Sequence, residues 1–141
     1  MCLAPEQCDL RMLLLREGRR LTWRRPLLRI ARGVCAALEF LHSDAASVAH
    51  GDLRPSNILI TADGEPRLCD FDNARRLGRT TSTDTVAGLP PKPKPPAQSY
   101  YIAPELLGCG ADGVAFTHDA TASGDIFACV ILAAYLNPAG D

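Results

Sequence analysis

A short hairpin pattern is the feature that most constrains how this chain of 141 residues can fold. The run Ile-Leu-Ile at 58–60 and the run Arg-Leu-Cys at 67–69 flank Ala-Asp-Gly at 62–64, and Asp-Gly favours the tight turn of a β-hairpin. The pattern therefore predicts a small β-hairpin, with Asn57 directly before its first strand and Asp70 directly after its second.

Helical patterns surround the hairpin on both sides. One apolar stripe recurs at steps of three and four and predicts an amphipathic helix that starts between Thr22 and Pro26. Its members are Leu27, Ile30, Val34, Leu38 and Leu41. Residues 8–17 predict a shorter helix that ends before Gly18, and residues 103–107 predict one helical turn. Residues 125–136 are apolar on all sides, which predicts a buried helix.

Composition narrows the class of protein. The 22% of charged and 47% of hydrophobic residues predict a soluble globular domain, and the net charge of −1 gives no electrostatic case for nucleic acid or an anionic membrane as partner. The six cysteines form no C-x-x-C pair, which favours free thiols in a reducing compartment. No signal peptide is visible and the longest apolar run is far shorter than a membrane span, so we expect a cytoplasmic protein, with the nucleus possible.

Three further stretches carry residues typical of phosphoryl transfer. His-Gly-Asp-Leu-Arg-Pro-Ser-Asn lies at 50–57, Asp-Phe-Asp follows at 70–72, and Tyr-Ile-Ala-Pro-Glu follows at 101–105. In order and spacing they resemble the catalytic loop, the metal-binding Asp-Phe-Gly and the Ala-Pro-Glu of eukaryotic-type protein kinases. The helix that begins near Asp125 is similar to a large-lobe helix of that family, so the resemblance covers essentially the whole chain.

The resemblance implies an α+β fold, a mainly helical protein-kinase-like large-lobe fragment with a small β-hairpin, in which the small lobe is absent. Residues 1–141 would form a partial kinase domain with the catalytic loop at 48–57, the metal-binding motif at 70–72, the activation segment at 70–105 and the buried helix from 125. We expect residues 80–96, rich in Thr and Pro, to be the mobile part of that segment. We also expect the family's G-x-G-x-x-G loop and Val-Ala-x-Lys strand to be missing, and the chain alone to be inactive.

The family's chemistry implies a role for each site residue. The reaction moves the γ-phosphate of ATP to a protein hydroxyl, and Pro55 favours Ser/Thr over Tyr as acceptor. Asp52 would accept the hydroxyl proton and Arg54 would contact the transferred phosphate and pair with Asp52. Asn57 and Asp70 would hold Mg²⁺ and, through it, the triphosphate, because Mg²⁺ prefers oxygen ligands.

Four further residues lie beside the predicted site residues in the sequence, and two of them differ from the family pattern. We expect His50 to pack and hydrogen-bond within its loop and Phe71 to pack in the core. Gly51 stands where many kinases have an Arg that binds a phosphate on the activation segment, so that mode of ordering is lost. Asp72 replaces the glycine of Asp-Phe-Gly and adds negative charge beside the metal.

Two other readings stay open at this point. A small-molecule phosphotransferase of the aminoglycoside or choline kinase type resembles the chain at 50–52 and 70–72, but that family lacks the Ala-Pro-Glu and the helix from Asp125. A pseudokinase or scaffold would explain Gly51 and Asp72, whereas the retention of Asp52, Asn57 and Asp70 argues against it.

Overall fold

The computed structural model describes residues 8–17, 26–78, 100–110, 113–116 and 120–136. Its three α-helices are α1 (Leu10–Glu17), α2 (Leu28–His42) and α3 (Ala122–Leu136). One antiparallel sheet has the strand order β1-β3-β4, made of β1 (Cys8–Asp9), β3 (Ile58–Ile60) and β4 (Pro66–Leu68). Two further pairs join β2 (Val48–Ala49) to β5 (Arg75–Arg76) and β6 (Leu107–Gly110) to β7 (Gly113–Phe116). Short 3₁₀ turns lie at Pro55–Asn57, Phe71–Asn73 and Pro104–Leu106.

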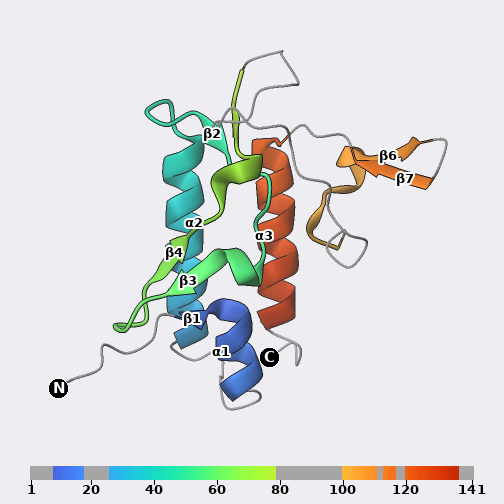
Figure 1. Cartoon of the computed structure of the whole chain (residues 1–141). Coiled ribbons are helices and arrows are strands. Elements are labelled where there is room, and N and C mark those ends of the chain that lie inside the picture. The colour runs from blue at the N-terminus through green and yellow to red at the C-terminus, as the bar shows by residue number, and fades with distance from the viewer. Residues whose placement is uncertain (1–7, 18–25, 79–99, 111–112, 117–119, 137–141) are drawn as a thin grey trace.

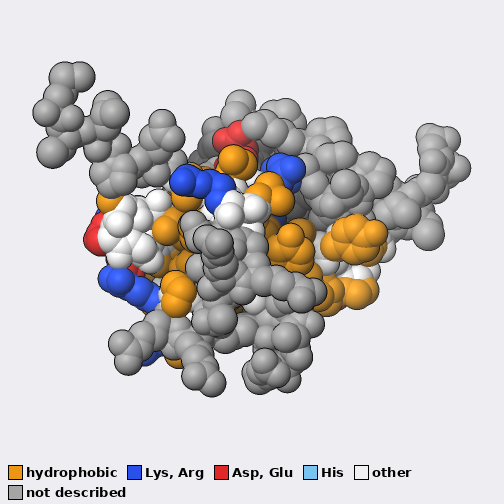
Figure 2. Space-filling model, turned by 90° about the horizontal axis from the view of Figure 1, so that it is seen from below, with side chains coloured by type: hydrophobic (Ala, Val, Ile, Leu, Met, Phe, Trp, Pro, Cys, Tyr) orange, Lys and Arg blue, Asp and Glu red, His pale blue; other side chains and the backbone are white. Residues whose placement is uncertain are grey.

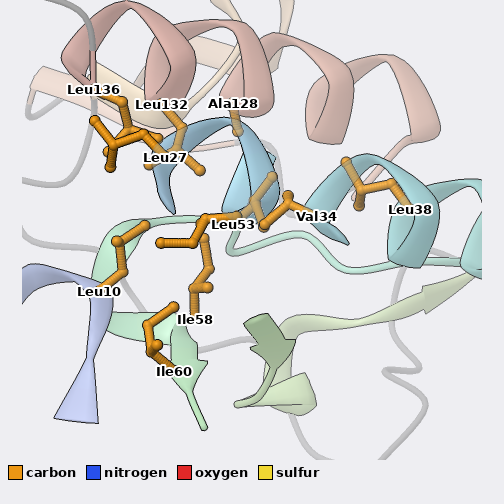
Figure 3. Packing of buried hydrophobic residues seen from close by; sticks show 11 residues of the cluster. Leu10, Leu27, Val34, Leu38, Leu53, Ile58, Ile60, Ala128, Leu132 and Leu136 are labelled. Atoms are coloured by element: carbon orange, nitrogen blue, oxygen red, sulfur yellow. The ribbon is translucent and has the colours of Figure 1, made fainter. Parts of the chain in front are cut away.

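Helix α2 follows the predicted stripe and forms the centre of the core. Leu27, Ile30, Val34 and Leu38 are buried, and Leu41 packs against them. Helix α3 packs against α2, and both helices also contact β2 (Figure 1). Figure 3 shows the side chains of Leu53 and Ile58 close to those of the two helices, so the loop and hairpin share one core with them.

The hairpin prediction is confirmed. Ile58 pairs with Leu68 and Ile60 with Pro66, and the N–H of Thr61 donates to the carbonyl of Glu65 across the turn (2.9 Å). Gly64 adopts a φ of 81°, a left-handed value that suits glycine in such a turn. Ile58 and Ile60 are buried beneath the sheet, which fixes its register.

The first predicted helix is shorter than expected. Cys8 and Asp9 form a strand that pairs with β3 instead of a helical turn, and α1 begins at Leu10. Asp9 accepts a hydrogen bond from the N–H of Met12 (2.7 Å), the geometry of a side-chain cap at a helix N-terminus. The predicted start of the second helix at Thr22 lies outside the described residues, as do residues 80–96 of the expected mobile segment.

The prediction that α3 is buried on all sides is wrong for the structure described. One face is buried, and its members are Gly124, Asp125, Ala128, Leu132 and Leu136. The other face leaves Ile126, Val130 and Tyr135 between 51% and 61% exposed. Figure 2 shows hydrophobic side chains at the molecular surface seen from below. No helix within the described residues is long and apolar enough to cross a membrane.

The expectation that the chain holds no G-x-G-x-x-G sequence is also wrong. Gly-Cys-Gly-Ala-Asp-Gly occupies residues 108–113, and it forms the end of β6, the connection and the start of β7. This hairpin follows the Ala-Pro-Glu instead of preceding the catalytic loop, and in Figure 1 it lies to one side of the helices. Its place in the chain therefore differs from that of the glycine-rich loop in the resembled family.

Candidate active site

A buried carboxylate holds the loop at residues 50–57, which is the predicted catalytic loop and is called the catalytic loop below. Oδ2 of Asp125 accepts the N–H of His50 (2.7 Å) and lies 2.9 Å from Nε2 of His42, while Oδ1 accepts the N–H of Gly51 (2.8 Å). Asp125 is 2% exposed, so these bonds replace the water that its charge would otherwise need. Helix α3 thereby fixes the loop backbone directly before Asp52.

The middle of the loop is fixed by apolar contact. Leu53 is 2% exposed, and Figure 3 shows it among core side chains that include Val34 and Ile58. Asp52 and Arg54 flank this residue and are both half-buried. A loop attached at Asp125 and at Leu53 has little freedom to move its polar side chains, which is what a catalytic geometry requires.

Three predicted site residues meet in this loop. Nδ2 of Asn57 donates to the backbone carbonyl of Asp52 (2.8 Å) and to its carboxylate Oδ2 (3.1 Å). Nε of Arg54 lies 3.7 Å from the same Oδ2, in an ion pair that was predicted from the sequence. The Asn57 amide is thus oriented with its nitrogen toward Asp52. Its oxygen Oδ1 accepts a hydrogen bond from Oγ of Ser56 (3.3 Å) and has a second lone pair that could bind a cation.

His50 links the two loops and stays neutral. Its Nδ1 accepts the N–H of Asp52 (3.2 Å), so Nε2 carries the proton and donates to the carbonyl of Cys69 (3.1 Å). Burial lowers the pKa of His50, although the charges of Asp125, Asp52 and Asp70 and the bond to Cys69 act in the opposite direction. The expectation that this side chain packs and hydrogen-bonds is confirmed.

Phe71 does not pack in the core as expected. The residue is 37% exposed, and its ring lies against the imidazole of His50, with 4.7 Å between the ring centroids. The adjacent Asp70 has left-handed backbone angles (φ 63°, ψ 70°), an uncommon conformation for a residue with a side chain. The loop therefore turns sharply at Asp70 and rests its next side chain on the catalytic loop.

Asp70 and Asn57 lie at the same edge of the hairpin. The N–H of Cys69 donates to the carbonyl of Asn57 (3.0 Å). Asp70 directly follows Cys69, and its side chain is exposed. An exposed carboxylate and an amide oxygen are donors that Mg²⁺ accepts, with its remaining positions filled by water or phosphate. Within the described residues no group of three or more His, Cys, Asp or Glu side chains is arranged to hold a metal.

Gly51 has a backbone that excludes the family's arginine. Its φ is 74°, and a Cβ at this position would lie 2.7 Å from the carbonyl oxygen of Asn73 and 2.6 Å from Cβ of Ala120. Distances this short require the backbone to shift. In this structure glycine brings the two loops into contact where a side chain would separate them.

Comparison with known proteins decides the family. The protein kinase domain family matches residues 1–138, which is nearly the whole chain. The chain belongs to the protein kinase family. Kinases of this family use ATP and a divalent metal, so the donors at the hairpin edge fit the cofactors of the family.

Similar kinases come from fungi and plants. A MAP kinase kinase, skh1/pek1, of Schizosaccharomyces pombe is 38% identical over 90 residues, which cover 64% of this chain and 22% of that protein. Lectin-domain containing receptor kinase VI.4 of Arabidopsis thaliana is 32% identical over 120 residues, or 83% of this chain and 15% of that protein. The chain thus spans less than a quarter of the length of these relatives.

The sequence predicted which loop would carry the site, but the contacts that support this loop were missed. It named Asp125 only as the start of a helix, whereas the structure makes this residue the anchor of the catalytic loop. One signal could have found it, since an aspartate at the start of an otherwise apolar helix must find buried partners. It also missed that Cys69 supplies both a donor and an acceptor to the neighbouring loop.

Proposed function

We propose that this chain is the central part of the large lobe of a protein kinase that transfers the γ-phosphate of ATP to a protein hydroxyl, with Ser/Thr as acceptor. The observation that carries the proposal is the hydrogen-bonded pair of Asp52 and Asn57, with Asp70 at the end of the neighbouring strand β4. Phosphoryl transfer needs a group for the acceptor hydroxyl beside a metal that binds the phosphates. This edge of the hairpin offers residue types suited to both tasks.

Asp52 is the proposed base for the acceptor hydroxyl. Its carboxylate is positioned by Asn57 and lies beside Arg54, so it has a fixed orientation and a cationic neighbour. A carboxylate held in this way can accept the proton that the attacking hydroxyl loses. Arg54 is the proposed contact for the transferred phosphate, since its guanidinium can bind two oxygens at once.

Asn57 and Asp70 are the proposed ligands of Mg²⁺. The carboxylate of Asp70 is exposed and Oδ1 of Asn57 lies on the side of the amide away from Asp52. The metal, when bound, would neutralise charge on the ATP phosphates. The protein's own contribution is to keep the two ligands on adjoining strand ends, so that few groups need to be ordered on binding.

The competing functions are less well supported. The family match over residues 1–138 favours a protein kinase over a small-molecule phosphotransferase. A scaffold without turnover has no need of the bonded Asp52 and Asn57 pair, although Gly51 and Asp72 depart from the family pattern. Pro55, buried at the start of a 3₁₀ turn, supports the Ser/Thr assignment through the family pattern alone.

We further propose that the chain by itself does not transfer phosphate. The sequence holds no Val-Ala-x-Lys strand, and its G-x-G-x-x-G lies after the Ala-Pro-Glu. A kinase positions ATP between two lobes, and correct positioning supplies about 7–11 kcal/mol of the barrier lowering. Purified chain incubated with labelled ATP, Mg²⁺ and a generic protein substrate should give no more product than its Asp52→Asn variant.

The experiment that tests the main proposal uses this chain fused to the small lobe of another protein kinase. Transfer from labelled ATP to a generic protein substrate should fall about 10²–10⁴-fold in Asp52→Asn, because the general base is lost. Asp63→Asn, in the exposed hairpin turn, is the matched control and should keep the wild-type rate. Phosphoamino acid analysis should show phosphoserine or phosphothreonine. Equal rates for the two variants would contradict the role of Asp52, and phosphotyrosine would contradict the acceptor class.

A further inference from the structure

Positive charge is concentrated in one stretch of the sequence. Residues 11–32 hold eight arginines and one acidic residue, Glu17, whereas the rest of the chain holds seven basic and fifteen acidic residues. The net charge of −1 thus combines one strongly basic stretch with an acidic remainder. All basic residues of the stretch are Arg, whose planar guanidinium can pair with a carboxylate through two hydrogen bonds. The stretch is therefore suited to carboxylate partners.

Part of this stretch forms the outer face of α1. Among the α1 side chains whose burial the structure describes, the exposed ones are Arg11, Met12, Leu15 and Arg16, a set called the α1 patch below. Helical positions three and four apart are neighbours, so Met12 lies beside Leu15 and Arg16, and Arg11 lies beside Leu15. Helix α1 is at the lower end of the molecule in Figure 1, and Figure 2 shows basic side chains beside hydrophobic ones in the view from below.

The α1 patch has the composition of a protein interface. Met12 is 48% exposed and Leu15 is 67% exposed. One exposed apolar side chain is common on a protein surface, but here two neighbouring ones are flanked by Arg11 and Arg16. Met and Arg are enriched in protein interfaces, whereas Lys, Glu and Asp are depleted there. The patch therefore offers both an apolar contact area and two cations beside it.

The inner side of α1 is fixed to the rest of the fold. Leu10 is fully buried, and Leu13 and Leu14 pack against the core. Asp9 caps the first turn of the helix, and α1 also contacts the 3₁₀ turn Pro55–Asn57 at the end of the catalytic loop. A surface that is held in this way before binding loses little conformational entropy when a partner binds.

We propose that the α1 patch binds an acidic segment of another protein, in which one or two large apolar side chains lie among Asp and Glu. The carboxylates of this segment would pair with Arg11 and Arg16, and its apolar side chains would cover Met12 and Leu15. Helix α1 has 8 residues and is about 12 Å long, so the contact fits a short segment. An anionic membrane fits less well, because it would repel the acidic remainder of the chain. The inference stands whether or not the protein transfers phosphate.

The test measures binding of a fluorescein-labelled peptide to the purified full chain by fluorescence anisotropy. The peptide has about 12 residues, with Leu at every fourth position and Glu at the others, which is long enough to cover α1. Combining Arg11→Glu with Arg16→Glu should raise the dissociation constant at least about 10-fold, because two attractions become repulsions. The matched control combines Arg67→Glu with Arg76→Glu, which change two exposed arginines outside α1, and should stay within about 3-fold of wild type because salt screens distant charges.

A second pair of variants tests the apolar part of the contact. Leu15→Ala should raise the dissociation constant at least about 5-fold, because the apolar area that the peptide covers is reduced. Phe40→Ala, which changes a 63% exposed side chain on α2, should stay within about 2-fold of wild type. All these side chains are exposed, so the thermal midpoint of each variant should stay close to that of the wild type.

Several outcomes would overturn the proposal. One is the absence of saturable binding, and another is equal affinity for a peptide with Lys in place of Glu. Equal losses in the patch variants and their controls would show that α1 is not the binding surface. Binding to vesicles of phosphatidylcholine and phosphatidylserine in place of the peptide would assign the patch to a membrane. Self-association of the chain that Arg11→Glu with Arg16→Glu abolishes would show that a second copy covers the patch.

Discussion

The two loops that carry the site are fixed in different ways. The catalytic loop is attached to the body of the protein, through Asp125 on α3 and through Leu53 in the core. The Asp70 loop is attached to the catalytic loop, through the bonds of Cys69 to Asn57 and His50 and through the ring of Phe71. The proposed base is therefore held by α3 and the core, whereas the proposed metal ligand, in the loop between β4 and β5, depends in addition on contacts with the loop of the base.

Because one loop supports the other, a substitution can affect one or both loops, depending on where it is made. A change at Asp125 should disturb both loops, because the second is positioned by the first. A change at the contact between the loops should disturb Asp70 more than Asp52. The predictions below test this order, beginning with the support beneath both loops.

Removing the buried carboxylate should have the largest effect. Asp125→Ala leaves the N–H groups of His50 and Gly51 without their acceptor in a buried site, which should cost about 3–5 kcal/mol in the free energy of unfolding. Urea denaturation of the purified chain measures this loss. Asp44→Ala, at an exposed position, is the control and should change it by less than about 0.5 kcal/mol. A loss below about 1 kcal/mol for Asp125→Ala would show that α3 does not support the loop.

A side chain at Gly51 should push the loops apart. Gly51→Ala must adopt a φ of 74°, which costs about 1–2 kcal/mol, and its Cβ would also meet the carbonyl of Asn73. Overpacking of this kind adds about 1–3 kcal/mol. Gly78→Ala is a matched control, because its φ is 76° but nothing lies within 4 Å of the added Cβ. The difference between the two losses in urea denaturation isolates the contact, and equal losses would show that the loops are not in contact there.

Acid should weaken the link that His50 makes between the loops. Burial lowers its pKa in the folded state below the unfolded value of 6.5, so the unfolded chain binds more protons in this range. The stabilisation is therefore present above pH 6.5 and is lost as the pH falls from 6.5 toward the lowered folded value. His50→Gln should flatten this part of the profile of unfolding free energy against pH. If the slope of unfolding free energy against pH were the same in the variant, other groups would be responsible for the pH dependence.

The sequence predicted those features that local patterns encode. The spacing of apolar residues at steps of three and four predicted α2, and Asp63-Gly64 predicted the turn of the hairpin. In the structure, Asn57 and Asp70 lie at the same edge of this hairpin. The pairings of β1 with β3 and of β2 with β5 could not be predicted, because two-residue strands have no periodicity and depend on distant partners. The exposed face of α3 was missed for a related reason. When a helix is apolar on all sides, its sequence does not indicate which side packs against the rest of the protein.

The candidate site residues could be named from the sequence, whereas the contacts that support them could not. Motif spacing singled out Asp52 and Asp70 as candidates, while the backbone hydrogen bonds of Cys69 and the tilted contact between the rings of Phe71 and His50 arise only once the loops have met. Every residue type except proline has the same backbone N–H and carbonyl groups, so hydrogen bonds between these groups cannot be predicted from sequence motifs. The support of a site therefore has to be sought in the structure.

The most direct test of the account asks whether the two loops form one metal and phosphate site. The measurement is the Mg²⁺ dependence of phosphate transfer by this chain fused to the small lobe of another protein kinase, compared between Asp70→Asn and Asp72→Asn. Asp70 would be a ligand and Asp72, two residues later in the same loop, would not. We predict that Asp70→Asn raises the Mg²⁺ concentration for half-maximal rate at least about 10-fold, since losing a metal-site interaction costs about 10–100-fold, and that Asp72→Asn stays within about 3-fold of wild type. Equal shifts for both variants, or none for Asp70→Asn, would contradict the claim that this edge of the hairpin holds the metal.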